Sequence, residues 1–483
     1  MALYPTCLRV NRNPLFVAYA TLSTLLTGCA LPSADVSTPT ATASVPSAWT
    51  QPAPTDAPVV DLRNWWKAFN DPVLDALVQE ANTSNLDLAL SQSRLREARL
   101  ASGRTAAQYL PSLSANIQTL QDISATDTYF HASIDMVWEL GLFGAAQSAR
   151  QAAQAVAAAA GADTQGVRVS VVADVVRNYL DLRAAQQQLV HLQRMAALDE
   201  RALSLAEVRV RTHQGSADEV TQARLRIEQV RATQALLQLA SANAAQALAV
   251  LLGRTSLDPV WHQTPVNHIL PALAPFALAQ VPADLLRTRP DVHAAEAEVH
   301  RAAAALGLAR SELYPRITLG GSFLYAYNIT RNFRTRSDNA PAIGPIIDIP
   351  LFDWGRRRTQ VDIRQENLNA ALINYRRAVH HGIAETEGAL AALSAQQVRV
   401  DALTQAATLL GERTTAAQTQ ARLGLTSEYD TLARQRAQQQ SLAELDMALS
   451  ARALAFVALY KALGGAPLPK SESEDPAHAA TLP

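Results

Sequence analysis

The chain has 483 residues, and its 42 Lys and Arg against 43 Asp and Glu give a formal net charge of −1. This near balance argues against a nucleic-acid-binding protein, because such proteins present an excess of basic side chains to the phosphates. Aromatic residues make up 5 % and charged residues 18 % of the chain, whereas Ala, Leu and Gln dominate. These are good helix formers, so the composition favours long helices packed through small side chains over a compact globular enzyme.

Residues 1–28 are typical of a lipoprotein signal peptide. Two Arg residues are followed by a mostly apolar segment over 14–26, which is too short for a comfortable membrane span. The segment ends in Leu-Thr-Gly-Cys, which resembles a bacterial lipobox, so Cys29 is predicted to be lipidated and to become the new N-terminus. Cys7, the other of the two cysteines, leaves with the signal, so the mature chain has no disulfide. Ala30 at the next position favours the outer membrane.

Residues 29–60 are rich in Pro, Ser, Thr and Ala with hardly any charge. Such a segment cannot bury enough apolar surface to order itself, so it predicts a lipidated, flexible tether. No later segment has the run of apolar residues that a transmembrane helix needs. A membrane crossing by this chain would therefore have to be made by strands that close into a barrel.

Long helices dominate the rest of the pattern. Residues 144–213 contain no Pro and little Gly, which indicates one very long helix. Apolar or small residues recur there every seven positions, and the same spacing continues in the next segment, which predicts coiled-coil-like packing. The positions are Leu182, Leu189, Ala196, Leu203 and Val210, then Ala223, Val230, Leu237, Ala244 and Leu251.

The pattern occurs twice. Tyr109-Leu110-Pro111 and Leu313-Tyr314-Pro315 each end a helix, and their Pro residues stand 204 positions apart. Gly144 and Gly355 each open a long helix 211 positions apart, and Gly215 and Gly424 mark breaks 209 apart. This predicts a tandem duplication of one module: helix, strand pair, long helix, turn, long helix. The predicted repeats are 61–254 (strands about 111–139, long helices about 144–252) and 255–465 (strands about 315–351, long helices about 355–463), followed by a tail over 466–483.

The strand pairs alternate apolar and polar residues over about ten positions each, which suits tilted transmembrane strands. Four strands are too few to close a barrel, since even small closed barrels use about eight, but three copies of the chain would supply twelve. Two surface hairpins on a helical body are the alternative.

Several motifs, in order and in both halves, resemble the outer membrane factors, the TolC-type family, and within it the NodT-like lipoproteins of resistance-nodulation-division (RND) efflux systems. The matching segments are 65–75 (WWKAFNDPVLD), 85–88 (NLDL), 289–292 (RPDV), 350–357 (PLFDWGRR) and 424–432 (GLTSEYDTL). The resemblance covers essentially the whole chain from Trp65 to Gly465.

The resemblance implies a mostly α fold with a small β part, in which a homotrimer forms a 12-stranded β-barrel in the outer membrane and a periplasmic α-barrel. An equatorial belt would come from 60–80, 255–289 and the stretch after 463. The implied function is the exit duct of a tripartite efflux pump in a Gram-negative bacterium, with a periplasmic adaptor protein, an inner-membrane RND pump and outer-membrane lipid as partners. A duct for type I protein secretion and a non-pore coiled-coil lipoprotein are the alternatives.

Acidic and basic residues flank the two breaks between long helices. Asp218, Glu219, Glu428 and Asp430 follow the breaks, and three copies of each would ring a narrow opening that favours cations. Asp430 matches an acid that family apertures use, whereas Ala433 departs from a second one. Arg211 and Arg422 precede the breaks and could bridge to acids on a neighbouring hairpin. The simpler interpretations are that Ser427 and Asp218 cap new helices and that the Arg residues favour a helix C-terminus.

The breaks themselves are candidate docking tips for the adaptor: Gly215 and Ser216 in the first half, and Gly424, Leu425 and Thr426 in the second. Gly permits the tight turn and the close approach of another backbone.

No catalytic motif, metal site or cofactor site is predicted. The chain has no Gly-x-Ser-x-Gly elbow, phosphate-binding loop or His-Glu-x-x-His, which argues against a hydrolase or transferase. His380 and His381 are adjacent, so their side chains diverge on a helix and cannot share a metal.

Overall fold

The computed structural model describes most of the chain from Leu62 to Gly465. The signal peptide with Cys29, most of the predicted tether, much of the 255–289 part of the predicted belt and the tail lie outside the described residues. The described ranges are 49–50, 62–121, 127–262, 270–274, 288–330, 333–334 and 341–465.

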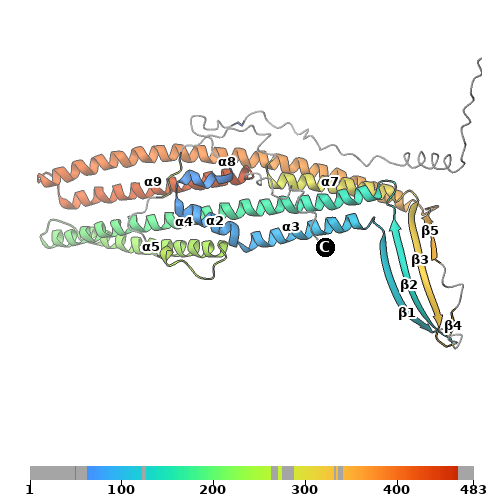
Figure 1. Cartoon of the computed structure of the whole chain (residues 1–483). Helices are drawn as coiled ribbons and strands as arrows, with labels where there is room; N and C mark the ends of the chain where they lie inside the picture. The colour runs from blue at the N-terminus through green and yellow to red at the C-terminus, as the bar shows by residue number, and fades with distance from the viewer. Residues whose placement is uncertain are drawn as a thin grey trace, which may run out of the picture. The chain divides into compact units, whose positions relative to one another are not determined.

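The elements follow the predicted order of helix, strand pair and two long helices in each half (Figure 1). The first half contains η1 (Leu62–Phe69), α2 (Pro72–Ser84), α3 (Leu86–Ala107), β1 (Ser112–Gln121), β2 (Thr128–Glu139), α4 (Ala145–Arg211) and α5 (Ala217–Leu251). The second half contains η2 (Pro259–His262), α7 (Pro290–Ser311), β3 (Arg316–Asn328), β4 (Phe333–Arg334), β5 (Pro341–Asp348), α8 (Arg356–Arg422) and α9 (Glu428–Ala462). Among the described residues, no helix has the length and apolar character needed to cross a membrane.

The two halves match element by element. Helices α3 and α7 have 22 residues each and start 204 positions apart, at residues 86 and 290. Helices α4 and α8 have 67 residues each, α5 and α9 have 35 each, and both pairs start 211 positions apart. Left-handed backbone recurs with the same offset, at Phe143 and Trp354 and at Gly253 and Gly464. The duplication therefore extends to the backbone conformation of single residues where one element connects to the next.

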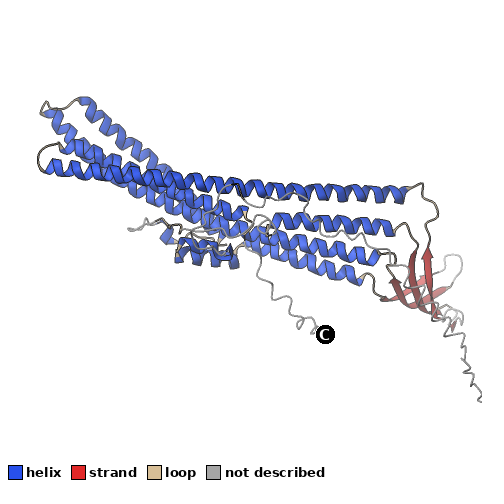
Figure 2. Ribbon diagram, turned by 90° about the horizontal axis from the view of Figure 1, so that it is seen from above, coloured by secondary structure: helices blue, strands red, loops and turns tan. Residues whose placement is uncertain are grey.

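All strands of the described residues join one antiparallel sheet, shown in red in Figure 2, so the hairpins are not two separate surface features. β1 pairs with β2, β2 with β3, and β3 with both β4 and β5. The link between the halves is the β2–β3 pairing, in which Ile134 lies opposite Phe323. β5 ends at Asp348, short of the predicted 351, since the Pro at 350 lacks the N–H that a further ladder bond needs.

Two compact units are present, and each draws on both halves of the sequence. Among the described residues, one comprises those within 96–159 and 295–375, and the other those within 49–95, 160–294 and 376–465. The first contains the sheet and a small apolar cluster in which α7 residues around Leu306 pack on Leu368 and Ala371 of α8.

The second unit holds the larger core. Trp65 from the WWKAF motif is fully buried and stacks on Tyr460 of α9, with ring centroids 4.3 Å apart. Phe69 and Phe456 complete this aromatic cluster. Burying one such side chain contributes roughly 1.5–3 kcal/mol, so the motif anchors the N-terminal segment to the end of α9.

The ten predicted heptad positions on α4 and α5 are all buried or half-buried. Leu192 and Met195 of α4 pack on Val230 of α5, with Ala196 and Leu237 alongside. The predicted helix–helix seam is therefore confirmed.

Candidate functional site at the helical tips

Two hairpin turns, one between α4 and α5 and one between α8 and α9, form the predicted tips. Gly424 adopts the left-handed conformation that its turn requires (φ 70°), as expected of glycine. In the first half His213, and not Gly215, has the left-handed conformation (φ 58°). His213 and Gly424 are 211 positions apart, so the prediction that Gly215 is the counterpart of Gly424 was wrong.

The turn needs glycine at position 215 because a side chain would not fit there, and not because of the backbone conformation. A Cβ atom at this position would lie 2.8 Å from Cβ of Arg209, closer than packed atoms approach. The glycine therefore lets the Arg209 side chain fold back over the turn, where its Nη2 donates to the carbonyl of Gln214 at 3.2 Å.

The helices after the turns begin with serine caps. The Ser427 hydroxyl oxygen accepts from the backbone N–H of Asp430 at 3.1 Å, as predicted, and the Ser427 hydroxyl donates to the Asp430 carboxylate at 2.7 Å. In the first half the cap is Ser216 and not Asp218, because the side chain of Ser216 reaches the N–H of Glu219. Asp218 lies in the first turn and accepts from Gln222 at 2.9 Å.

The four predicted gate acids fall into two classes. Glu428 forms a paired hydrogen bond with Arg201 of α4, with Nε–Oε1 at 2.9 Å and Nη2–Oε2 at 3.2 Å. Glu219 lies 3.3 Å from Nε of Arg209. Asp218 and Asp430 are exposed, and neither forms an ion pair within the described part of the chain. Of the four acids in the predicted ring, these two therefore keep a negative charge that no guanidinium of the described residues neutralises.

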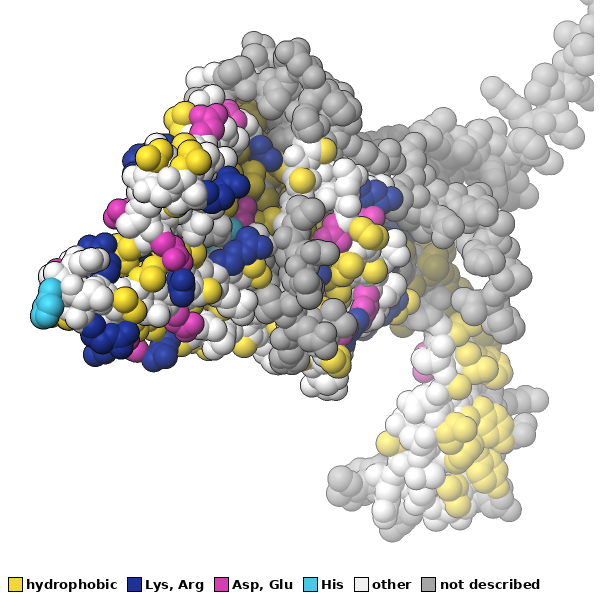
Figure 3. Space-filling model, turned by 90° about the vertical axis from the view of Figure 1, so that its left-hand side faces the viewer, with side chains coloured by type: hydrophobic (Ala, Val, Ile, Leu, Met, Phe, Trp, Pro, Cys, Tyr) yellow, Lys and Arg dark blue, Asp and Glu magenta, His cyan; other side chains and the backbone are white. Residues whose placement is uncertain are grey.

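Near the tips, side chains of the described residues connect the two hairpins in two places. One is the Arg201–Glu428 pair, whose hydrogen bond raises the pKa of Arg201. The other is the Arg209 guanidinium over the Tyr429 ring, 5.0 Å from its centroid. On the face seen in Figure 3, basic and acidic side chains are interspersed among apolar and other polar groups.

Arg211 and Arg422, the two Arg residues predicted to bridge the hairpins, take no part in these contacts. Arg422 donates to Thr419 of its own helix at 3.3 Å, and Arg211 is exposed. Within the described residues neither forms an ion pair, so any bridge from them remains a prediction. Arg201 was missed because it lies several turns before the break. Arg209 lies in the last turn of α4 beside Arg211, but nothing in the sequence distinguished it from Arg211.

A buried carboxylate fixes the helices behind the tips. Asp199 of α4 is 1 % exposed and accepts from Nε of Arg226 on α5 and from Nε of Arg436 on α9, both at 3.0 Å. Further along, His191 of α4 lies 2.7 Å from Asp446 of α9. Three helices from both hairpins therefore share one network of charged groups.

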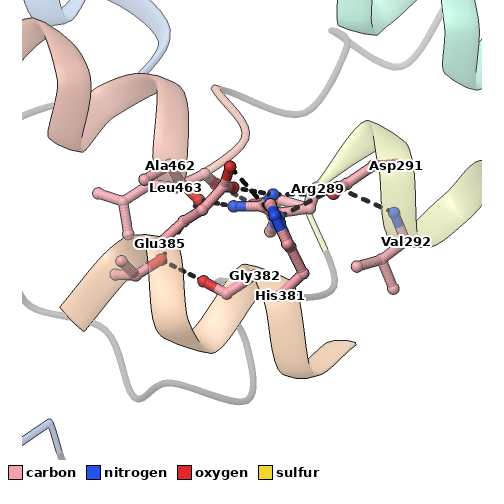
Figure 4. Close-up of polar contacts among 10 residues, drawn as sticks. Arg289, Asp291, Val292, His381, Gly382, Glu385, Ala462 and Leu463 are labelled. Carbon is pink, nitrogen blue, oxygen red and sulfur yellow. Dashed lines mark hydrogen bonds and ion pairs between the residues drawn. The ribbon is translucent and has the colours of Figure 1, made fainter. Parts of the chain in front are cut away.

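The C-terminal ends of α5 and α9 are fixed by the residues that precede α3 and α7. Figure 4 shows these contacts at α9. Buried Arg289 donates to the carbonyl of Ala462 and forms ion pairs with Asp291 at 2.8 Å and with Glu385 at 2.6 Å. Burial lowers the pKa of Arg289, but its hydrogen bonds to these two acids outweigh burial and raise it. Burial raises the pKa of Asp291, and the bonded guanidinium more than reverses this, so the net shift is downward.

In the first half, the C-terminal end of α5 is fixed in the equivalent way. Asn85, 204 positions before Arg289, donates to the carbonyl of Leu251 at 2.8 Å. Gly253 and Gly464 follow the two helices with positive φ, and a Cβ atom on either would lie within 2.6 Å of backbone atoms. The RPD and NLD segments thus have a structural role: they hold the C-terminal carbonyls that a helix leaves without partners.

No group of three or more His, Cys, Asp or Glu side chains within the described ranges is arranged to hold a metal ion.

Comparison with known proteins identifies the family. The family model described as outer membrane efflux protein matches residues 77–254 and 281–465. The chain belongs to this family.

Individual relatives match this chain over two thirds or more of its length. The pyoverdine export outer membrane protein OpmQ of Pseudomonas aeruginosa is 30 % identical, over 91 % of this chain and 96 % of its own length. The toluene efflux pump outer membrane protein TtgF of Pseudomonas putida is 28 % identical, over 68 % of this chain and 70 % of its own length. The solved structure of the outer-membrane channel OprN has a TM-score of 0.74 and 27 % identity, covering 87 % of this chain and 98 % of that chain.

These findings confirm the fold class and the location predicted from the sequence. The protein is an outer-membrane efflux channel, mostly helical, with tandem modules and strands that contribute to the trimeric barrel architecture of the family. This is a class of transport ducts.

Proposed function

We propose that the protein is the exit duct of a tripartite RND-type efflux pump, passing small molecules from the periplasm to the exterior. The observation that carries this proposal is the tandem repeat: the four long strands of the two modules form one sheet, and the long helices α4 and α5 pack on each other at the predicted positions. Three copies supply the twelve strands of a closed barrel. A duct lowers the barrier to transport by replacing lipid with water, so it needs no reacting side chain.

Small organic cargo is favoured over protein cargo. The names of OpmQ and TtgF refer to export of pyoverdine and of toluene, which are both small organic molecules. The relatives therefore support small-molecule efflux over the alternatives of type I protein secretion and a non-pore scaffold.

The partners follow from this role. A homotrimer in outer-membrane lipid would meet a periplasmic adaptor at the tips, and the adaptor would connect it to an inner-membrane pump. We assign the docking surface to Gly215, Ser216, Gly424, Leu425 and Thr426. Leu425 supports this, because its side chain is 74 % exposed at the end of the turn, where an apolar group is available to a partner. Cys29 would add a multi-chain lipid anchor, which loss of palmitate labelling in Cys29→Ala would verify.

Deleting the gene and complementing it tests the assigned function. The deletion is expected to raise accumulation of a fluorescent small-molecule pump substrate, and the wild-type gene should restore efflux. Leu425→Trp should fail to restore efflux while still forming trimers, because the bulky ring blocks docking. Leu239→Trp on α5, a position 58 % exposed, is the control and should restore efflux. Unchanged accumulation together with loss of a secreted protein would instead support a secretion duct.

Asp430 is the residue we propose for the gate. Its carboxylate is exposed and lacks an ion pair among the described residues, so three copies would concentrate negative charge at the opening. Asp430→Asn keeps the shape and the serine cap but removes the charge. It is expected to raise single-channel conductance at low divalent cation and to weaken block by calcium.

Glu312→Gln, at an exposed acid in the turn that follows α7, serves as the control and should leave calcium block unchanged. If Asp430→Asn conducts like the wild type and is blocked equally by calcium, the assignment of Asp430 to the gate is wrong.

A further inference from the structure

A cavity of about 470 Å³ lies where the strands meet the helices, within the compact unit that contains the sheet. Its walls are the turns that follow α3 and α7, the start of β3, and the connections from β2 to α4 and from β5 to α8. None of the residues at the helical tips lines it. A volume of this size suits a small organic molecule.

Charged side chains of both signs line this cavity. They are Arg316, Arg356 and Arg357, and Glu139, Glu312 and Asp348. Within the described part of the chain, neither Arg356 nor Glu139 forms an ion pair. Arg316 and Asp348 lie 3.8 Å apart and are 65 % and 64 % exposed, so their attraction is weak. Positive and negative groups are therefore both available to a bound molecule.

Two tyrosines are fixed in the wall of the cavity. The carbonyl of Tyr109 accepts from the indole N–H of Trp138 at 3.0 Å, and the Tyr109 ring lies so close to Gly141 that a Cβ atom there would be 2.5 Å from it. The ring of Tyr314 stacks on Phe143, with centroids 5.0 Å apart and planes at 17°. Because both rings are held in place before a ligand arrives, little conformational freedom is lost when they contact an aromatic group.

The register of the sheet shows which face the cavity adjoins. Hydrophobic side chains gather on one side of the strands in Figure 3. Side chains alternate along a strand, so Ile134 of β2 and Ile347 of β5 share one face, whereas Glu139 and Asp348 lie on the other. In a membrane barrel the apolar face meets lipid and the polar face meets the water inside. The cavity therefore adjoins the path of the cargo.

We propose that this cavity binds cargo molecules that carry a carboxylate, an ammonium group and an aromatic body. The guanidinium of Arg356 pairs with the carboxylate, and the carboxylate of Glu139 pairs with the ammonium. Tyr109 and Tyr314 contact the aromatic body. A molecule with one sign of charge leaves one of the two protein charges without a partner and binds less tightly. The proposal rests on the proposed function, because cargo reaches the polar face of the sheet only through a duct.

Three dansyl compounds with the same fluorescent ring system test this preference. Nε-dansyl-lysine carries an α-ammonium and an α-carboxylate, dansylcadaverine carries only an ammonium, and dansylglycine carries only a carboxylate. Titration of the purified wild-type trimer, followed by dansyl fluorescence, is expected to show Nε-dansyl-lysine binding about fivefold more tightly than either of the others, since one further charge pair at a partly exposed site has about this effect. Equal affinities of the three compounds would overturn the proposal.

Single variants assign the two charges. Arg356→Gln should weaken binding of Nε-dansyl-lysine and of dansylglycine about fivefold, with dansylcadaverine bound no less tightly. Glu139→Gln should weaken Nε-dansyl-lysine and dansylcadaverine, with dansylglycine bound no less tightly. Arg301→Gln is the matched control, because Arg301 is 46 % exposed on α7 and does not line the cavity, and it should change none of the three affinities. Affinities unchanged in Arg356→Gln and Glu139→Gln would also overturn the proposal.

Current recording distinguishes this proposal from the duct itself. Nε-dansyl-lysine added to conducting wild-type channels is expected to cause brief interruptions of the current. In Arg356→Gln these should be about fivefold shorter, because weaker binding mainly speeds dissociation. No interruptions at a saturating concentration, or interruptions equally long in the variant, would show that the cavity does not bind cargo inside the duct. A protein that never conducts would contradict the duct instead, and the three affinities would still decide what the cavity binds.

Discussion

Asp199→Asn is expected to destabilise the helical tips by about 3 kcal/mol, because it leaves two guanidinium groups without their shared buried anion. The Asp199 carboxylate is 1 % exposed, and the side chains of Arg226 and Arg436 are 28 % and 25 % exposed. Water therefore reaches the Arg residues only in part, and cannot replace the lost carboxylate. The three helices that meet at this residue belong to both hairpins, so the loss affects the whole tip.

Hydrogen exchange measures this effect locally. About 3 kcal/mol corresponds to roughly a hundredfold faster exchange through local opening, expected for amides of α4, α5 and α9 around the network. Asp218→Asn is the matched control, since that acid is exposed and forms no ion pair among the described residues, and it should change exchange very little. Equal exchange in Asp199→Asn and the wild type would show that the network does not hold the tips together.

Arg289→Ala is expected to cost a similar amount, about 3 kcal/mol, at the other end of the hairpins. The guanidinium is 6 % exposed and binds two carboxylates and the last carbonyl of α9. Removing it leaves a gap at a buried position and takes the donor from two acids that are 48 % and 44 % exposed, whereas the Ala462 carbonyl keeps the hydrogen bond from the Thr386 hydroxyl. Because the Arg289 side chain itself is buried, its loss also removes packing, so it costs more than the loss of a surface pair. Arg289→Lys should rescue only in part, because a lysine cannot make the paired bonds of the planar guanidinium.

Thermal unfolding of the detergent-solubilised protein checks this prediction. Arg301→Ala is the control, because Arg301 forms an ion pair of similar length with Glu298 but is 46 % exposed, and such surface pairs contribute less than about 1 kcal/mol. The unfolding midpoint should fall clearly for Arg289→Ala and hardly for Arg301→Ala. Similar midpoints for both variants would contradict a special role for Arg289.

The long helices could be predicted from the sequence because their cause is local. The absence of Pro over 144–213 and the seven-residue spacing both act within one segment, and α4 and the α4–α5 seam appear where they indicate. The repeat could also be read directly, since the Pro residues before the strands lie 204 positions apart and the Gly residues that open the long helices lie 211 apart.

The turns between the long helices were less predictable, because more than one residue can adopt the left-handed conformation or cap the next helix. Gly215 was the natural candidate for the left-handed position, but His213 takes it, and a seven-residue pattern gives no warning of this. Asp218 resembled a cap, yet Ser216 reaches the free N–H groups first.

The ion pairs of the tips could not be predicted at all. Arg201 and Glu428 are 227 positions apart, and Asp199 and Arg436 are 237 apart. Which charges meet depends on the rotation and stagger of packed helices, and the sequence pattern specifies neither closely enough to pair individual side chains.

Single-channel recording tests the central claim most directly, that three copies enclose one water-filled tube. Purified trimers of the wild type, of the loosened-tip variant Asp199→Asn and of the gate variant Asp430→Asn are added to a planar lipid bilayer. We expect discrete current steps that grow with salt concentration and are larger for the variants. Correctly inserted trimers that pass no current above the bare bilayer, even with loosened tips, would contradict the duct.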